Sequence, residues 1–302
     1  MRSKNMSDVI SKRSELLFCY DVQDSNPNGD PLDENKPRID EETSINIVTD
    51  VRLKRTIRDY FFDYKGYNGE KGKDIFVREK ESVKGGLQDG KERAKDFKED
   101  KDRVLNECID IRLFGGVIPL ADASITFTGP VQFKMGRSLH PVELKHIKGT
   151  GAFASKAGNK QATFREEYVL PYSFICFHGV INENAGRHTL LTHEDIKLLL
   201  EGMWQGTKNL ISRSKWGQMP RLLVKIDYQE PGYFIGDLDC YLKLKCEHTA
   251  KIRGPKDFTL DISELLQTFS RETGKISGIQ YKIDPTLKIE PAVPGDWQMI
   301  EY

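Results

Sequence analysis

Apolar and polar positions along the chain predict a mixed set of strands and helices. Residues 15–22 form an almost wholly apolar run, which is typical of a strand buried on both faces. Residues 124–135 alternate with a period of two and predict a half-buried strand, with Pro130 placing it at an edge or a bulge. Residues 168–181 are apolar on both faces, as expected of a central strand. Further strands are predicted over 221–228, 238–246 and 276–283.

Two amphipathic helices lie between these strands. The first is expected to start at Thr49 as its N-cap, and the second at Thr192. The apolar stripe of the first comprises Leu53, Ile57, Tyr60, Phe61 and Tyr64. That of the second comprises Ile196, Leu199, Leu200, Met203 and Leu210. The resulting order of strand, helix, strand, strand, helix, strand predicts an α+β fold of the ferredoxin-like plan, which RNA-recognition modules share.

Two polar segments interrupt this plan. Residues 65–103 are rich in Lys, Asp, Glu and Gly, so we expect an inserted region without a core of its own, with a helix near 91–110. Gly115 and Gly116 should end that element with a sharp turn. Residues 137–166 form a second insertion, which is polar, basic and punctuated by glycine.

The stretch from Asn26 to Phe62 combines a turn-rich loop with a basic helix. Pro27, Gly29 and Pro31 exclude a helix at its start, and Asn28-Gly29 favours a tight turn. Four cations follow within seven residues of the helix: Arg52, Lys54, Arg55 and Arg58. Because like charges repel, a bound anion would relieve this cluster, whereas the alternative is an ordinary solvated helix face.

The charged residues are informative through their distribution along the chain. The 302 residues hold 46 cations and 46 anions, and this balance argues against a nucleic-acid-binding protein, since such domains are usually basic. However, residues 128–165 hold seven cations and one acid, and residues 206–226 hold five cations and no acid. Residues 21–42 hold eight carboxylates and two cations. A neutral chain with such patches can form a basic groove or stack with copies of itself, and its acidic loop is suited to a metal, to a basic partner or to solvent.

No motif predicts small-molecule chemistry. The chain has no phosphate-binding glycine loop, nucleophile elbow or zinc-binding His pair, so we expect no catalytic residue, metal or cofactor. His178 is predicted to be a satisfied core histidine. Of the five cysteines, those at 19, 176, 240 and 246 are predicted to be reduced core thiols of a cytoplasmic protein. No signal peptide or membrane span is predicted.

Several blocks together resemble a known family. They are YDVQDSNPNGDP, PRID and VTDVRLKRTIRDY near the N-terminus, then DIRLFGG, GPVQFKMGRSLHP and YVLPYSFICFHGVIN. In this order they resemble the CRISPR-associated backbone subunits of Cascade-type surveillance complexes, which belong to the RAMP superfamily. Type I-B (Csh-type) is the nearest group and type I-C (Csd-type) the next. The resemblance covers roughly residues 14 to 230.

This resemblance implies a right-hand shape with a palm, fingers and a thumb. The ferredoxin-like palm would comprise residues 14–64, 107–136 and 167–246. The fingers would be residues 65–106 and the thumb 137–166, and residues 247–302 would form an extension packed on the palm.

The resemblance also implies that copies stack head to tail along one CRISPR RNA, beside other Cascade subunits and the target DNA strand paired to the guide. The motif by which RNA-recognition domains stack bases is absent, so contacts from cations to phosphates fit better. The RNA-binding residues that we expect are Asn26, Asn28, Arg52, Lys54, Arg55, Arg58, Gln132, Lys134, Arg137, Lys145, His146 and Lys148.

Two alternatives stay open. Backbone subunits of type III complexes resemble this fold and cleave RNA with a metal through a loop aspartate, and Asp24, Asp30, Asp33 and Asp40 are candidates here. A structural subunit whose basic stretches contact only protein is the other. The type I resemblance favours a subunit that holds RNA and is not an enzyme.

Overall fold

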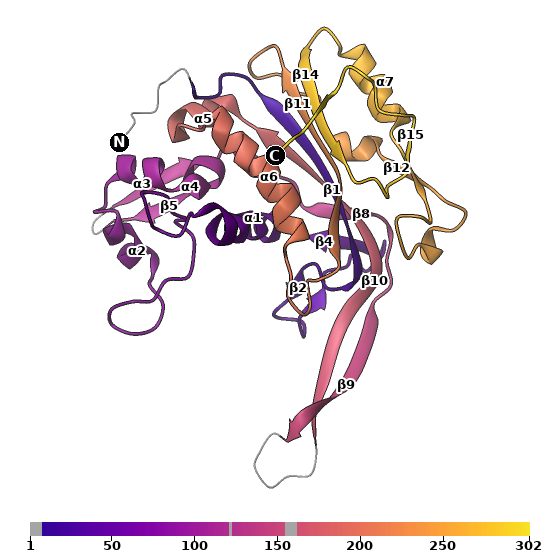
Figure 1. The fold of residues 1–302 in the computed structure, drawn as a ribbon, viewed down its shortest axis with the longest axis horizontal. Coiled ribbons are helices and arrows are strands. Elements are labelled where there is room, and N and C mark those ends of the chain that lie inside the picture. The colour runs from indigo at the N-terminus through magenta and orange to yellow at the C-terminus, as the bar shows by residue number, and fades with distance from the viewer. Residues whose placement is uncertain (1–7, 121–122, 155–161) are drawn as a thin grey trace.

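The computed structural model describes residues 8–120, 123–154 and 162–302. Its centre is a twisted sheet in the order β16-β14-β11-β1-β10-β8-β4, with β7 and β9 also paired to β10 (Figure 1). The strands of this sheet are β1 (Ser14–Ser25), β4 (Ile45–Val48), β7 (Val131–Phe133), β8 (Gly136–Pro141), β9 (Lys145–Ala154), β10 (Ala162–Ile181), β11 (Gln218–Tyr228), β14 (Ile276–Ile283) and β16 (Gln298–Met299).

Four of these strands and two helices make the predicted ferredoxin-like unit. Strands β11, β1, β10 and β7 are neighbours in that order, and each adjacent pair is antiparallel. Helix α1 (Asp50–Lys65) follows β1, and helix α6 (His193–Lys208) connects β10 to β11. Both helices begin where the sequence predicts, after Thr49 and after Thr192, which forms a capping box with Asp195.

The sheet is covered on both faces, which explains why residues 16–20 of β1 are all apolar and buried. Leu16 and Phe18 pack in the core beneath α1 and α6, whereas Leu17 and Cys19 pack in a second core on the opposite face. The second core is closed by α7 (Ser263–Arg271) and a small sheet (Figure 1). That sheet contains β12 (Lys243–Lys245), β13 (Thr259–Asp261) and β15 (Ile289–Glu290).

The polar region after α1 has a core of its own, so the expectation that it lacks one was wrong. Phe76 and Phe97 are buried together, with ring centroids 5.8 Å apart, and Ala94, Val104 and Leu105 belong to the same cluster. Cys108, Ile111 and Ile118, which follow the polar region in the chain, complete this core. The single helix expected near 91–110 is three short helices instead. They are α2 (Gly90–Asp96), α3 (Lys101–Glu107) and α4 (Ile109–Phe114), beside the hairpin of β5 (Gly115–Pro119) and β6 (Ser124–Thr128).

The period-two run over 124–135 is two strands in two different sheets. Its first half is β6, which pairs with β5, and its second half is β7, which pairs with β10. Gly129 and Pro130 break the run between them, because proline lacks the N–H that a continuous strand would use. Met135, the last residue of the run, is exposed.

Other sequence expectations fail where local patterns were ambiguous. The strand predicted over 238–246 is a 3₁₀ helix, η2 (Leu238–Tyr241), followed by β12, and Cys240 is exposed rather than in the core. Tyr64 is exposed on α1, and Leu210 lies beyond the end of α6. The remaining short elements are β2 (Gly29–Asp30), β3 (Lys36–Pro37), α5 (Glu183–Thr189) and η3 (Thr249–Lys251).

Strands β9 and β10 extend beyond the sheet as a long two-stranded hairpin (Figure 1). The pairing runs from Lys145 opposite Val169 to Ala154 opposite Ala162. The predicted thumb residues 137–166 therefore divide between β8, inside the main sheet, and this hairpin. In the described part of the chain, every helix is too short or too polar to cross a lipid bilayer.

Candidate nucleic-acid interface

The turn-rich loop is attached directly to the start of α1. The side-chain oxygen of Asn28 accepts hydrogen bonds from the backbone N–H of Thr49 at 2.8 Å and from its hydroxyl at 2.9 Å. Asn26 is also buried, and its amide donates to the Asn35 carbonyl at 2.7 Å. Both asparagines thus hold the loop in shape against the helix.

Three of the four cations between positions 52 and 58 of α1 are neutralised by carboxylates of the same chain. The ion pairs are Lys54 with Asp50 at 2.9 Å, Arg55 with Asp59 at 2.6 Å, and Arg58 with Asp110 at 3.0 Å. Mutual repulsion among four free cations, the reason to expect a bound anion, is therefore largely absent. Only Arg55 among these three has a substantially exposed side chain.

Arg58 and Lys54 lie deeper than the sequence suggested. The Arg58 side chain is 12% exposed and its partner Asp110 is fully buried. Lys54 is also buried, and its amine donates to the Gln132 side-chain oxygen at 3.1 Å. Residues of α4 and β7 cover both head groups, so neither is an ordinary solvated cation.

Arg52 has a different environment. Its Nη2 donates to the Thr56 hydroxyl at 3.0 Å, while its buried Nε has no hydrogen-bond partner. Burial lowers the pKa of its guanidinium from the usual value. Among the described residues, no carboxylate lies within ion-pair distance of Arg52, so its charge is only weakly compensated.

A second cation lies beside Arg52. The Lys215 amine donates to the Asn26 carbonyl at 2.6 Å and has no carboxylate partner within the described part of the chain. Burial, with a smaller contribution from the charge of Arg52, lowers the pKa of Lys215 to about 8. Two desolvated cations that disfavour one another are stabilised by an anion such as a phosphate.

This Arg52–Lys215 pair lies at the base of the β9–β10 hairpin. The loop that carries Lys215 contacts the hairpin through an ion pair between Arg213 and Glu167 at 3.2 Å. Trp216 in the same loop is 71% exposed. A basic pair, an exposed indole and the hairpin therefore meet at one end of the sheet.

The hairpin residues predicted to bind RNA are exposed. His146 and Lys148 both approach Glu166, at 3.4 and 3.3 Å, and Lys145 lies at the start of β9. The His146 ring also stacks on Tyr168, with centroids 4.5 Å apart. These contacts fix an aromatic surface where the hairpin leaves the sheet.

The strand residues predicted to bind RNA do not form one row. Gln132 lies with Lys54 against α1, whereas Lys134 pairs with Asp237 on the segment after β11. Arg137, at the start of β8, lies 3.9 Å from Asp40 of the acidic loop.

Comparison with known proteins identifies the family. The model of the family described as CRISPR-associated protein Cas7 matches residues 12–263. A protein of Haloferax volcanii named CRISPR-associated protein Cas7 is 32% identical over 309 residues, covering 92% of this chain and 88% of that protein. The chain belongs to the Cas7 family.

Two solved structures share the fold of this chain. A chain from a CRISPR RNA-guided surveillance complex, described as pre-nicking, superposes with a TM-score of 0.59 and covers 95% of this chain and 96% of its own. A second chain from such a complex superposes with a TM-score of 0.50, covering 94% and 96%. Each is 12% identical to this chain, so these likenesses concern the fold.

The acidic loop of this Cas7 protein is held by its own contacts. Asp30 pairs with Arg38, and Asp33 pairs with Lys36 at 2.7 Å. Asp40 accepts backbone N–H groups within its turn, and the bond from Thr43 in particular lowers the pKa of its carboxyl. Within the described residues, these aspartates form no group of three ligand side chains.

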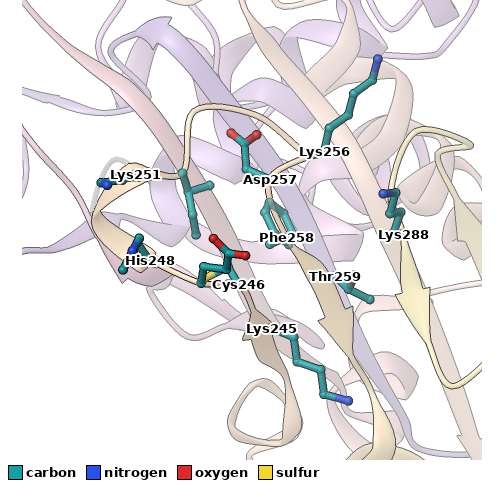
Figure 2. Close-up of a pocket in the computed structure, with 11 residues that line it drawn as sticks. Lys245, Cys246, His248, Lys251, Lys256, Asp257, Phe258, Thr259 and Lys288 are labelled. Atoms are coloured by element: carbon teal, nitrogen blue, oxygen red, sulfur yellow. The ribbon is translucent and has the colours of Figure 1, made fainter.

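The C-terminal region contains a pocket of about 410 Å³ lined by four lysines. Figure 2 shows that Lys245 and Lys256 extend in different directions from Phe258 at its centre. Their amines therefore do not converge on one ligand, and this pocket lacks the arrangement found at Arg52 and Lys215.

Sequence reasoning missed Lys215 as a member of the interface. The signal was present, because residues 206–226 were identified as a basic stretch without acids. The sequence could not show that Arg52 lies beside Lys215, because most of the ferredoxin-like unit separates the two residues along the chain.

Proposed function

We propose that this Cas7 protein is a backbone subunit that binds CRISPR RNA in a type I surveillance complex, of the I-B kind by its sequence blocks. The observation that carries the proposal is the pair of half-buried cations, Arg52 and Lys215, without carboxylate partners in the described structure. Backbone phosphates are the sequence-independent anions that a guide RNA offers at regular intervals.

The shape of the molecule supports the rest of the proposal. The ferredoxin-like unit is the palm, the region with α2 to α4 the fingers, and the β9–β10 hairpin the thumb (Figure 1). The hairpin of one copy reaches a neighbouring copy along the RNA, next to the guide and the target DNA strand. The acidic loop and the basic stretches suit such head-to-tail stacking, which does not close on itself.

We further propose a structural rather than a catalytic role beside the other Cascade subunits, without a cofactor. Each of Asp30, Asp33 and Asp40 already serves a turn or an ion pair. We propose that the protein is located in the cytoplasm, because all five of its cysteines are free thiols.

The test measures assembly on RNA of increasing length by light scattering, together with affinity against salt concentration. We expect mass to increase stepwise with RNA length. Arg52→Ala with Lys215→Ala should weaken binding for every sequence alike. It should also reduce the salt slope by about 1.4 per protomer, since each phosphate on a single strand contributes about 0.7.

The matched control is Lys84→Ala with Lys197→Ala, which removes two exposed cations elsewhere, with side chains 88% and 78% exposed. This control should bind RNA nearly as the wild type does. Equal losses in both double variants would show that only net charge matters, and a monomer on long RNA would overturn the proposal. Metal-dependent cleavage of RNA would instead indicate the nuclease alternative.

A further inference from the structure

Three ligand-type side chains, none of them among the residues expected to bind RNA, converge beside β10. His178 lies on β10, while Asp237 and Asp239 lie at the start of η2, after β11. One ligand atom from each of the three lies within 4.8 Å of the others. A cavity of about 470 Å³, lined by Lys134, His178 and Asp237 among others, opens beside them.

Glu15 fixes the orientation of the His178 ring. Its fully buried carboxylate accepts the backbone N–H groups of Ile235 at 2.9 Å and Gly236 at 3.0 Å, and also the hydroxyl of Tyr228. The His178 Nε2 lies 2.6 Å from the same carboxylate. Because a carboxylate with these donors is an acceptor, this network assigns the ring proton to Nε2 and a lone pair to Nδ1.

The other ring nitrogen is left without a partner. The His178 side chain is 3% exposed, and its Nδ1 makes no hydrogen bond. The prediction of a satisfied core histidine is thus met at only one of its two nitrogens. Nδ1 faces the Asp239 Oδ1 at 3.7 Å, which is too long for a hydrogen bond.

A lone pair facing a carboxylate oxygen needs a positive charge between them. Two ligand atoms bound to one zinc ion at the tetrahedral angle lie about 3.4 Å apart, close to the observed separation of Nδ1 and Oδ1. A carboxylate that holds the far nitrogen of a histidine is the usual support of a metal-binding imidazole. Glu15 occupies that supporting position here.

The outer side of this group is covered by a cation of the chain itself. The Lys134 amine pairs with Asp237 and lies 3.4 Å from the Asp239 carboxylate. The hydrogen bond from Lys134 lowers the pKa of the Asp237 carboxyl. Asp237 has a φ of 48°, in the left-handed region that non-glycine residues rarely adopt. Its side chain is 70% exposed, so solutes reach the carboxylates from solvent.

We propose that His178 Nδ1, Asp237 and Asp239 bind a divalent metal ion, that Glu15 orients the imidazole, and that Lys134 competes with the ion for the two carboxylates. One imidazole nitrogen with two carboxylate oxygens suits Zn²⁺ better than Mg²⁺, which prefers oxygen ligands alone. The bound ion ties the segment after β11 to β10 and frees the Lys134 amine.

The test is calorimetric titration of chelator-treated full-length protein with Zn²⁺, and then with Mn²⁺ and Mg²⁺. The wild type should bind one Zn²⁺ at this site and gain thermal stability. Lys134→Ala should bind it at least about tenfold more tightly, because a competing positive charge is removed. Asp237→Asn with Asp239→Asn should lose that one binding event, and both positions are accessible enough for the variant to fold.

The matched control is Asp33→Asn, which alters another exposed aspartate paired with a lysine and should leave binding unchanged. Zinc bound through Cys240, Cys246 or His248 would persist in the double Asn variant and is distinguished in this way. An unchanged number of bound ions and unchanged affinity in that variant would overturn the proposal.

Discussion

Arg58 on α1 donates from Nε to the Asp110 carboxylate on α4 at 3.0 Å, and 52 positions of sequence separate the two residues. The same carboxylate accepts the backbone N–H of Phe76 at 2.8 Å and of Val77 at 3.0 Å. This one buried group therefore joins the first helix of the ferredoxin-like unit to the region that contains α2 to α4.

The first prediction concerns this ion pair. Arg58→Ala should lower the free energy of unfolding by about 3 kcal/mol, because it leaves a fully buried carboxylate without its cation. Chemical denaturation with urea measures the loss. Arg55→Ala is the matched control, since Arg55 pairs with Asp59 on the exposed side of the same helix and should cost less than about 1 kcal/mol. Similar losses in both variants would contradict the anchoring role of Asp110.

The second prediction concerns the pH dependence of Lys215. Its pKa of about 8 is below the ordinary 10.5, so the unfolded chain binds a proton that the folded chain lacks between these pH values. The free energy of unfolding should therefore rise with pH across this window. Below pH 8 the cost of burying the charged Lys215 amine is fully present. Affinity for RNA should change in the opposite direction, because the neutral amine no longer attracts a phosphate. The logarithm of affinity should fall by up to about one unit per pH unit above pH 8.

Fluorescence anisotropy with labelled RNA between pH 7 and 9 measures this change in affinity. Lys215→Arg is the control, because a guanidinium stays charged throughout this range and should remove the pH dependence. If wild type and Lys215→Arg show the same pH profile, Lys215 does not contact the RNA.

The third prediction concerns Tyr168, which joins the hairpin to the acidic loop. Its hydroxyl donates to the Glu34 carboxylate at 2.9 Å, and the Lys36 amine lies 5.3 Å from its ring centroid. Tyr168→Ala should increase hydrogen exchange at the amides of residues 33–36 severalfold, because the loop loses both contacts. Tyr168→Phe keeps the ring and loses only the hydroxyl, so its effect should be intermediate. Exchange that stays at the wild-type rate in Tyr168→Ala would show that β2 and β3 hold the loop alone.

The fourth prediction concerns Gly115 at the end of α4. It has a φ of 68°, and a Cβ there would lie 2.2 Å from the Phe127 carbonyl oxygen. Gly115→Ala should lower the thermal midpoint and cost more than about 1 kcal/mol, through both the backbone conformation and the clash. Gly85→Ala tests the first contribution alone, because Gly85 also has a positive φ of 89° but meets nothing within 4 Å. The prediction fails if the two variants lose equal stability.

The sequence determined the elements whose signals are local. Thr49 and Thr192 cap their helices because a side-chain oxygen meets a backbone N–H three residues later. Strands β1 and β10 were predicted because both of their faces are buried over their central residues, which favours long apolar runs. The ferredoxin-like order followed from these elements.

Two of the ion pairs on α1 were also readable from the sequence. Asp50 with Lys54, and Arg55 with Asp59, are spaced four residues apart on one helix, a separation that brings side chains together. Reading the four cations at positions 52–58 without these neighbouring acids led to the expectation of a freely exposed basic face.

Only the tertiary structure decided which cations remain uncompensated. Asp110 reaches Arg58 because α4 packs against α1, and Lys215 reaches Arg52 because the loop after α6 returns beside the acidic loop. The meeting of His178 with Asp237 and Asp239 likewise depends on how the segment after β11 crosses β10. Charge interactions depend on distance and burial in space, and neither is set by spacing along the chain.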